Sequence, residues 1–388
     1  MLCLSRLAGL LVVACALGFV VGGCGEKPET NSDLEGQVRE YIEKFPYQDT
    51  HDYAVKYTQG DPSKLNTLTG GPPEPSLARA GEDIVVRSNN DTFYTGGFVL
   101  LEDGPVILRS DAPSQDRFFS FQLMDDRNIN YRNIIRPSGS YTLYFGEKPK
   151  EVVGEAIEVP SNLSAVLVRV EVMDKNDPED VAAATAVYKG ITMEGPVIEE
   201  FPALDLLSEF DPKVAEEANR RMDEAFATVP FTDTILRPGQ ELGKDVPYLH
   251  HAAGTKGAWG GPVPSHSAYE MIFVDQEGET LDGTKGTFTL TTTAPPVDAF
   301  WSITVYDTAR GGHLHPNEDN RYHINNTGAV RNEDGTYTFT FKTKCEDGDL
   351  NCVEVPAGPF DLTARYYLPK EEIISGTWTM PRPNLQQR

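Results

Sequence analysis

A run of small polar side chains, Asn89-Asn90-Asp91-Thr92 followed by Tyr94, stands directly before an apolar stretch of the chain. Asp91 could act as a general base or orienting carboxylate, while Asn90 and Tyr94 bind a polar ligand. The same residue types also form ordinary turns, because Asn and Asp side chains hydrogen-bond to their own backbone. The stretch is therefore either a turn or a site, in which Asn89 and Thr92 are further ligand contacts.

A second carboxylate follows in the segment RFFSFQLMD, residues 117–125. In a strand, Gln122 and Asp125 fall on opposite faces, and Asp125 ends the apolar face. Asp91 and Asp125 are candidates for the paired carboxylates that hydrolyse glycosidic or glycosylamide bonds. Arg169 is the candidate cation to meet them, although its alternation with valines also fits an arginine that faces solvent. Gln122 is either a satisfied core amide or a group that lines a pocket.

Two segments of the C-terminal half, residues 298–307 and 360–368, also alternate polar and apolar side chains. Aromatic and charged groups on such strands suit sugars and other polar, ring-containing ligands. A solvated sheet face has the same pattern, so both interpretations stay open. The candidate ligand contacts here are Trp301, Tyr306, Arg365 and Tyr367, with Arg321 and Tyr322 in a nearby loop.

Histidine spacing raises the question of a metal site at His313 and His315. A His-x-His pair on a strand places both imidazoles on one face. Glu318 follows too soon to complete a cupin-like ligand set, although His323 could serve as a third ligand. The flanking Gly, Pro and Asn indicate an exposed loop. We therefore predict no metal. Phosphate-binding, dinucleotide-binding and serine-nucleophile motifs do not occur, so no cofactor is predicted either.

The first residues predict export. Arg6 precedes an apolar run over 7–21, and Gly22-Gly23-Cys24 follows. This pattern is typical of a bacterial lipoprotein signal peptide over 1–23, cleaved so that Cys24 carries lipid; an ordinary signal peptide is the alternative. Residues 24–34 are polar and form a flexible tether. The predicted location is the bacterial cell envelope, with the membrane as partner through the lipid anchor.

Charge and cysteine content narrow the class further. The chain has 34 basic and 59 acidic residues, and loss of the signal peptide removes only Arg6, which leaves a net charge of −26. Such a chain repels phosphate backbones, so nucleic acid is excluded as a partner. Two cysteines lie beyond Cys24, and in an exported protein Cys345 and Cys352 predict one disulfide that closes a short loop.

Periodicity predicts a mainly β fold made of two β-sandwich or jelly-roll-like domains with a helical connecting segment. The domains are expected at 35–175 and 238–388, and the helical connector at 176–237. A short amphipathic helix is expected over 34–45. Residues 93–101 and 106–110 are expected to pair as a hairpin around the turn EDGP. Asp177 and Asp211 each precede a proline, which predicts two helix starts.

Several motifs in order resemble a bacterial family. VVRSNNDTFYTGGFVLLEDGPVIL and RFFSFQLMD resemble domain of unknown function 1254, and PPVDAFWSITVYD, VPAGPFDLTARYYLPK and GTWTMP resemble domain of unknown function 1214. The resemblance implies two β-sandwich modules, jelly-roll-like in the C-terminal half, and export. The chain departs from the pattern at Ser88, at Cys352 and at the two histidines of GGHLHP.

Together these features predict an exported lipoprotein that binds a polar ligand, such as a glycan, peptide or small molecule, in an aromatic-lined cleft between or on its domains. The alternative is a cell-envelope hydrolase of an amide or glycosidic bond, with Asp91, Asp125 and Arg169 as catalytic groups. The residues do not indicate an oligomeric state.

Overall fold

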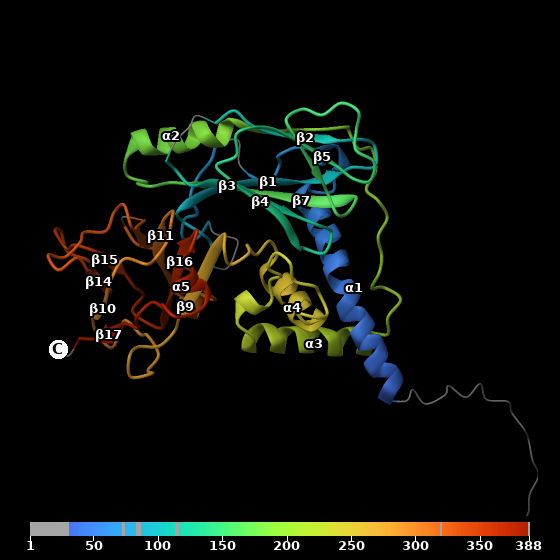
Figure 1. Cartoon of the computed structure of the whole chain (residues 1–388). Helices are drawn as coiled ribbons and strands as arrows, with labels where there is room; N and C mark the ends of the chain where they lie inside the picture. Colours follow the sequence, from blue (N-terminus) through green and yellow to red (C-terminus); the bar gives the residue numbers. More distant parts are fainter. Residues whose placement is uncertain (1–30, 72–73, 83–86, 113–115, 319, 387–388) are drawn as a thin grey trace, which may run out of the picture.

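The computed structural model describes residues 31–71, 74–82, 87–112, 116–318 and 320–386. The predicted signal peptide, Cys24 and most of the tether lie outside the described residues. Four β-sheets form two β-rich regions, and helices accompany them (Figure 1). The fold is thus a mixture of strand and helix rather than mainly β. No helix in the described part of the chain is long and apolar enough to span a membrane.

The N-terminal β-rich region contains two four-stranded sheets. The first has the antiparallel order β1 (Thr92–Leu100), β7 (Leu163–Glu171), β3 (Phe119–Met124) and β4 (Asn130–Ile135). The second has the order β6 (Glu155–Glu158), β5 (Gly139–Tyr144), β2 (Val106–Ser110) and β8 (Ile191–Glu194).

One hydrophobic core lies between these two sheets. Val166, Val168 and Val170 of β7 fill it from one side, and Leu108 and Leu143 fill it from the other. Alternation along the strands therefore holds as predicted. The predicted hairpin is wrong, because β1 pairs with β7 while β2 pairs with β5 and β8 in the other sheet. The turn between β1 and β2 therefore connects the two sheets on either side of the core, rather than two neighbouring strands of one sheet.

The C-terminal region is built in the same way. Its first sheet runs β12 (His313–Leu314), β11 (Trp301–Asp307), β16 (Phe360–Tyr367) and β9 (Ser267–Ile272), and β13 (His323–Asn325) also pairs with β11. Its second sheet runs β15 (Cys352–Glu354), β14 (Tyr337–Lys342), β10 (Phe288–Thr292) and β17 (Asn384–Leu385). The predicted disulfide between Cys345 and Cys352 is confirmed, with an S–S distance of 2.02 Å.

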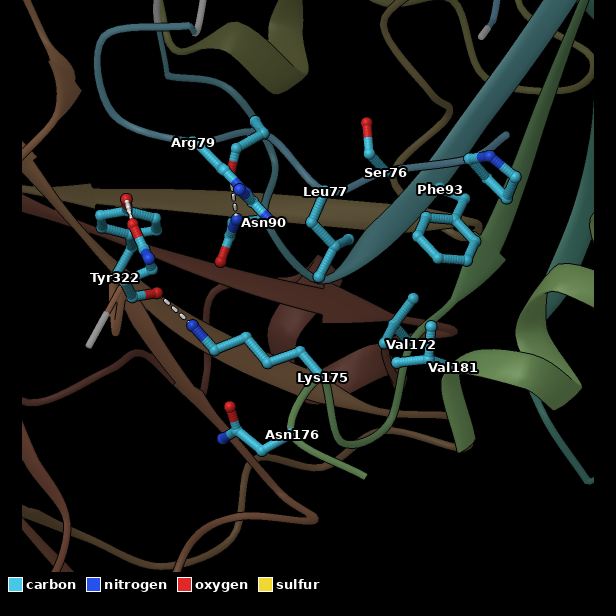
Figure 2. A pocket seen from close by; sticks show the side chains of 13 residues that line it. Ser76, Leu77, Arg79, Asn90, Phe93, Val172, Lys175, Asn176, Val181 and Tyr322 are labelled. Carbon is cyan, nitrogen blue, oxygen red and sulfur yellow. Dashed lines mark hydrogen bonds between the residues drawn. The ribbon is translucent and has the colours of Figure 1, made fainter. Parts of the chain in front are cut away.

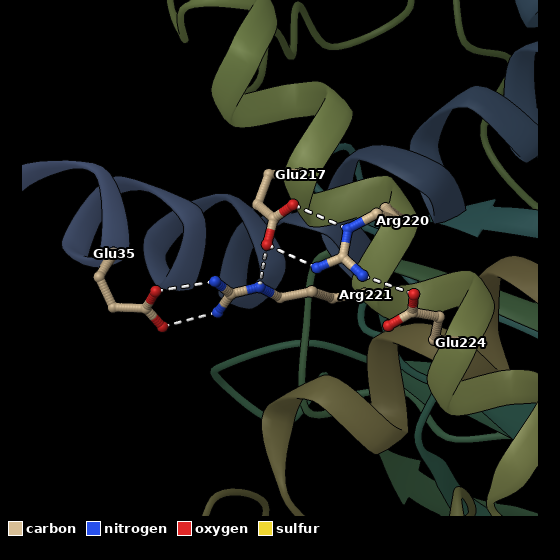
Figure 3. A network of polar contacts seen from close by, with 5 residues as sticks. All are labelled: Glu35, Glu217, Arg220, Arg221 and Glu224. Carbon is tan, nitrogen blue, oxygen red and sulfur yellow. Dashed lines mark hydrogen bonds and ion pairs between the residues drawn. The ribbon is translucent and has the colours of Figure 1, made fainter. Parts of the chain in front are cut away.

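Three helices form a separate cluster beside the sheets: α1 (Asn31–Tyr57), α3 (Pro212–Thr228) and α4 (Tyr248–Ala258). The predicted short helix begins earlier, inside the predicted tether, and continues past Pro46. Arg221 binds Glu35 of α1 and Glu217 of α3, and Arg220 binds Glu217 and Glu224 (Figure 3). These pairs are largely exposed, so the apolar cluster, rather than the ion pairs, holds the helices together.

The predicted connector contains more than helices. Helix α2 (Pro178–Lys189) and α3 start at Asp177 and Asp211 as predicted, and both caps accept a hydrogen bond from the helix backbone. Between them, β8 joins the N-terminal sheet, and α3 packs on α1 and α4. The described residues also include the short helix α5 (Glu371–Ile374) and 3-10 turns at Pro62–Lys64, Phe231–Asp233 and Thr308–Arg310.

Candidate functional site

The polar faces of two sheets meet at the interface between the β-rich regions. In the N-terminal sheet, Tyr94 and Ser120 lie directly opposite Arg169 on the neighbouring strands. In the C-terminal sheet, Ser302 and Tyr269 lie opposite Arg365 in the same way. The apolar faces of both sheets fill their own cores, so these polar faces pack against each other (Figure 1). The interpretation of the C-terminal face as a solvated sheet face is therefore wrong, because Tyr306, Arg365 and Tyr367 are buried.

Asp91 lies fully inside this interface, with no exposed surface. Its carboxylate accepts hydrogen bonds from Ser302 and from the hydroxyl of Tyr367, the latter at 3.1 Å. Burial is the largest influence on this carboxyl and raises its pKa, while the Arg365 charge and the hydrogen bonds oppose that rise. The Asp91 carboxylate of the N-terminal region therefore binds donors of the C-terminal region and joins the two regions.

Asn89 forms the predicted turn and also contacts the C-terminal region. Its side-chain oxygen accepts a bond of 2.9 Å from the Asp91 backbone, which is an Asx turn. Its amide nitrogen donates to the hydroxyls of Tyr94 and Tyr367 at 3.0 and 2.6 Å. The turn therefore also crosses the interface. The Thr92 hydroxyl is buried and has no hydrogen-bond partner among the described residues.

The residues before Asn89 also contact the C-terminal region. The Arg87 guanidinium pairs with the buried carboxylate of Asp361, and its backbone N–H donates to Gly312 at 2.9 Å. The Ser88 carbonyl accepts a bond of 2.7 Å from the hydroxyl of Tyr306. Arg365 binds the Arg87 carbonyl at 2.9 Å. The candidate residues Tyr306, Arg365 and Tyr367 thus lie on one face, as predicted, and that face holds the polar segment.

Arg169 is buried rather than solvent-facing, with 3% of its surface exposed. The covering C-terminal region excludes water from the face opposite the valines. Its guanidinium donates to the side-chain oxygen of Gln122 and to the Gly260 carbonyl, and lies 5.5 Å from the ring centre of Tyr94. Gln122 also donates to the carbonyls of Gly260 and Gly261. Gln122 is therefore a satisfied buried amide that positions Arg169.

The predicted carboxylate pair does not form. The Asp91 carbonyl accepts a hydrogen bond from the Val172 N–H, just past one end of β7. Asp125 lies near the other end of β7, because its neighbour Met124 is opposite Ala165. Seven strand residues separate these positions, or about 23 Å. Glycosidase carboxyl groups lie at most about 9.5 Å apart. The Asp125 carboxylate instead accepts from its own turn, at the backbone of Arg127 and Ile129 and the side chain of Arg127.

Two other candidates lie away from this interface. Trp301 points into the C-terminal core, where its ring packs edge-on against Tyr337 and Phe339. Strand alternation explains this, because Trp301 and Tyr306 fall on opposite faces. Arg321 is exposed on the loop before β13. Neither residue is placed where it could share a ligand with Arg365 or Tyr367.

A pocket of about 320 Å³ opens at one end of the interface (Figure 2). Its apolar wall is formed by Leu77, Phe93, Val172 and Val181. Its polar lining includes Asn90, Lys175, Asn176 and Tyr322. The pocket thus gathers two predicted ligand contacts, Asn90 and Tyr322, from opposite regions.

Polar contacts hold the pocket lining in place. The Asn90 amide donates to the Ala78 carbonyl, and its oxygen lies 3.0 Å from Nδ1 of His323. Burial lowers the pKa of His323 to about 3, so the ring is neutral at physiological pH. The Lys175 ammonium donates to the Asn320 carbonyl and lies 5.5 Å from the ring centre of Tyr322 (Figure 2). Lys175 of the N-terminal region therefore contacts Asn320 and Tyr322 of the C-terminal region.

The histidine pair does not gather a ligand set. His315 Nδ1 lies 3.8 Å from the carboxylate of Asp307, and burial lowers the His315 pKa. Within the described residues, no group of three or more His, Cys, Asp or Glu side chains could hold a metal ion.

Residues 75–79, His266 and Tyr269 lie at the interface and were not predicted as site residues. Residues 75–79 cover the pocket, and His266 lies buried beside Phe118, with ring centres 5.6 Å apart. His266 precedes β9 in a Gly- and Pro-rich stretch, so periodicity carries no signal for it. Tyr269 could have been predicted from the sequence, because it lies in the alternating polar and apolar pattern of the strand over 268–275.

Comparisons with known proteins agree with this two-region architecture. Residues 72–195 match Protein of unknown function (DUF1254), and residues 266–371 match Protein of unknown function (DUF1214). The chain therefore carries a DUF1254 domain followed by a DUF1214 domain. The pocket lining comes from both matched segments.

Two solved structures are similar. The VPA0106 protein from Vibrio parahaemolyticus has a TM-score of 0.73 and 20% identity, over 92% of this chain and all of that one. An uncharacterized protein from Burkholderia cenocepacia has a TM-score of 0.45 and 12% identity, over 92% and 90%. The first likeness supports the fold. Among curated proteins, none matches the chain.

Proposed function

We propose that this chain binds a small polar molecule in the pocket between its two β-rich regions. The observation that carries the proposal is a cavity of about 320 Å³ lined by both regions. Small-molecule sites usually measure about 300–1,000 Å³ and combine an apolar wall with a few polar groups. This pocket lies at the small end of that range, so its ligand is a small molecule or one residue of a glycan or peptide.

The lining specifies the kind of ligand. Leu77, Phe93 and Val172 offer an apolar surface for a ring or a short aliphatic part. The Lys175 ammonium and the Asn176 amide also line the pocket, and both can donate hydrogen bonds. A ligand that combines an apolar part with an acceptor or a negative group satisfies both kinds of lining residue.

A binding role is favoured over hydrolysis. The hydrolase interpretation requires two carboxylates about the scissile bond, and Asp91 and Asp125 lie about 23 Å apart along the sheet. Asp91 is fully buried under hydrogen bonds from Ser302 and Tyr367, which leaves it no access to a substrate.

We also propose that the mature chain is tethered to a membrane of the bacterial envelope by lipid on Cys24, as the sequence Gly22-Gly23-Cys24 suggests. In cells treated with globomycin, the unprocessed precursor should accumulate. Processing that continues unchanged, or that persists in Cys24→Ala, would rule out the lipoprotein route.

Titration of the mature chain by calorimetry with a panel of amino acids, sugars and sugar acids tests the pocket. Asn176→Ala removes an exposed pocket amide whose side chain makes no hydrogen bond within the described residues. Loss of one hydrogen bond should weaken binding about fivefold without loss of stability. Asn384→Ala, an exposed asparagine on β17, is the matched control. Equal affinity of both variants for the bound compound would refute this pocket as the site.

A further inference from the structure

The buried interface contains a cation, Arg169, that forms no ion pair with a carboxylate among the described residues. Arg169 has 3% of its surface exposed, and no carboxylate in the described part of the chain lies within 4.0 Å of its guanidinium. The other arginines near this interface differ. Arg87 pairs with Asp361, Arg117 pairs with Asp180, and Arg365 interacts electrostatically with Asp91. An isolated buried charge is costly unless a counter-charge or a full set of hydrogen bonds accompanies it.

Further polar atoms around Arg169 also lack partners. Ser120 lies opposite Arg169 on the neighbouring strand, where side chains are about 5 Å apart. Its hydroxyl, Nε of Arg169 and both ring nitrogens of His266 are buried without a hydrogen-bond partner among the described residues. Such groups are rare in native interiors, where more than about 90% of buried polar groups are paired.

The donors come from both β-rich regions. Arg169 and Ser120 belong to the N-terminal sheet, and His266 precedes β9 of the C-terminal sheet. Burial and the nearby Arg169 charge lower the pKa of His266 to about 3, so its neutral ring offers one N–H. The Arg169 guanidinium lies 5.5 Å from the ring centre of Tyr94, and the ring of Phe118 lies 5.6 Å from that of His266.

From this arrangement we infer that Arg169, Ser120 and His266 form an anion-binding site that takes the carboxylate group of a small acid. A guanidinium matches a planar carboxylate with two parallel hydrogen bonds, and a hydroxyl and an imidazole N–H complete the set of donors. The bound carboxylate supplies the counter-charge that Arg169 lacks, and its contacts to both regions hold the interface closed.

This site is separate from the pocket. Arg169 lies on the face of β7 opposite Val168 and Val170, whereas Val172, which lines the pocket, shares the face of those valines. Occupation of one site therefore does not require occupation of the other, and the two proposals can fail independently.

The test measures the melting temperature and the calorimetric affinity of the mature chain for acetate and formate, against chloride at equal ionic strength. We expect a saturable rise in melting temperature with the two carboxylates but not with chloride. Ser120→Ala keeps the charge of Arg169 and removes one neutral donor, which should weaken acetate binding about fivefold. Arg169→Gln should abolish it.

Arg117→Gln is the matched control, because it removes a buried arginine whose carboxylate partner is Asp180. It should lower stability but leave acetate affinity unchanged, as should Asn176→Ala in the pocket. If Arg169→Gln does not fold, the Ser120→Ala affinity decides. The proposal is overturned if acetate and chloride act alike on the wild type, if Ser120→Ala binds acetate as the wild type does, or if folded Arg169→Gln still binds it.

Discussion

The carboxylate of Asp91, just before β1, accepts a hydrogen bond of 3.1 Å from the hydroxyl of Tyr367 at the end of β16. These residues are 276 positions apart in the sequence and belong to different β-rich regions. The hydroxyl of Ser302 binds the same carboxylate. A single buried side chain therefore collects donors from two strands of the other region.

Replacement of Asp91 by alanine should lower the free energy of unfolding by about 3 kcal/mol, since it leaves the hydroxyls of Ser302 and Tyr367 without their charged acceptor. Urea denaturation of the mature chain measures this change. Asp103→Ala, at an exposed turn residue, should change stability by less than about 0.5 kcal/mol. Equal, small effects of the two substitutions would mean that the Asp91 contacts do not hold the regions together.

The pH dependence of stability should contain a contribution from Glu171. Burial is the main cause that raises the pKa of this carboxyl from 4.5 to about 7. Between these pH values the folded chain binds more protons than the unfolded chain, so the free energy of unfolding falls as pH rises. Titration of Glu171 should lower the free energy of unfolding by about 3 kcal/mol between pH 4.5 and pH 7.

Glu171→Gln isolates this contribution, because an amide oxygen can still accept the 2.8 Å bond from the Phe118 N–H. Denaturation curves at pH 4.5 and pH 8 should show a smaller loss of stability in the variant than in the wild type. Parallel pH profiles would show that Glu171 titrates alike in the folded and unfolded chains.

The disulfide between Cys345 and Cys352 should contribute about 2.5 kcal/mol, the loop-closure value for a separation of seven residues. The double substitution to serine should lower the midpoint of guanidinium denaturation accordingly. Reduction of the wild type with dithiothreitol should reproduce this shift and leave the double variant unchanged. A stability that does not respond to reduction would assign the disulfide no stabilising role.

Gly97 in β1 should not tolerate a side chain. A Cβ atom at this position would lie 2.1 Å from the Thr67 carbonyl oxygen, which is backbone and cannot turn aside. Gly97→Ala should therefore cost more than about 2 kcal/mol through overpacking. The control is Gly36→Ala on α1, where an added Cβ atom meets nothing within 4 Å and should not destabilise the chain. Gly146→Ala is unsuitable as a control, because Gly146 has a positive φ at which alanine is strained.

Local patterns in the sequence predicted the longer strands and the face that each of their side chains takes. Val166, Val168 and Val170 point into a core, and Arg365 and Tyr367 share the other kind of face, as alternation predicts. The two helix starts at Asp177 and Asp211 follow from their capping chemistry.

Long-range pairing was not predictable from those patterns. Adjacent strands usually pair, but β1 and β2 lie in different sheets on either side of one core. Alternation placed Arg169 opposite the valines, but only the presence of the C-terminal region makes that face buried. The carboxylate pair failed for the same reason, because residue types do not reveal at which end of a sheet each carboxylate lies.

The most direct test of ligand binding at the pocket is native mass spectrometry of the mature chain, isolated without denaturation from cells that produce it. The pocket predicts a bound small molecule that adds mass to the native protein and is lost on denaturation. Ser76→Trp, which puts a large ring at an exposed position of the pocket lining, should abolish that added mass. Identical native and denatured masses for the wild type, or added mass that persists in Ser76→Trp, would contradict the proposed function.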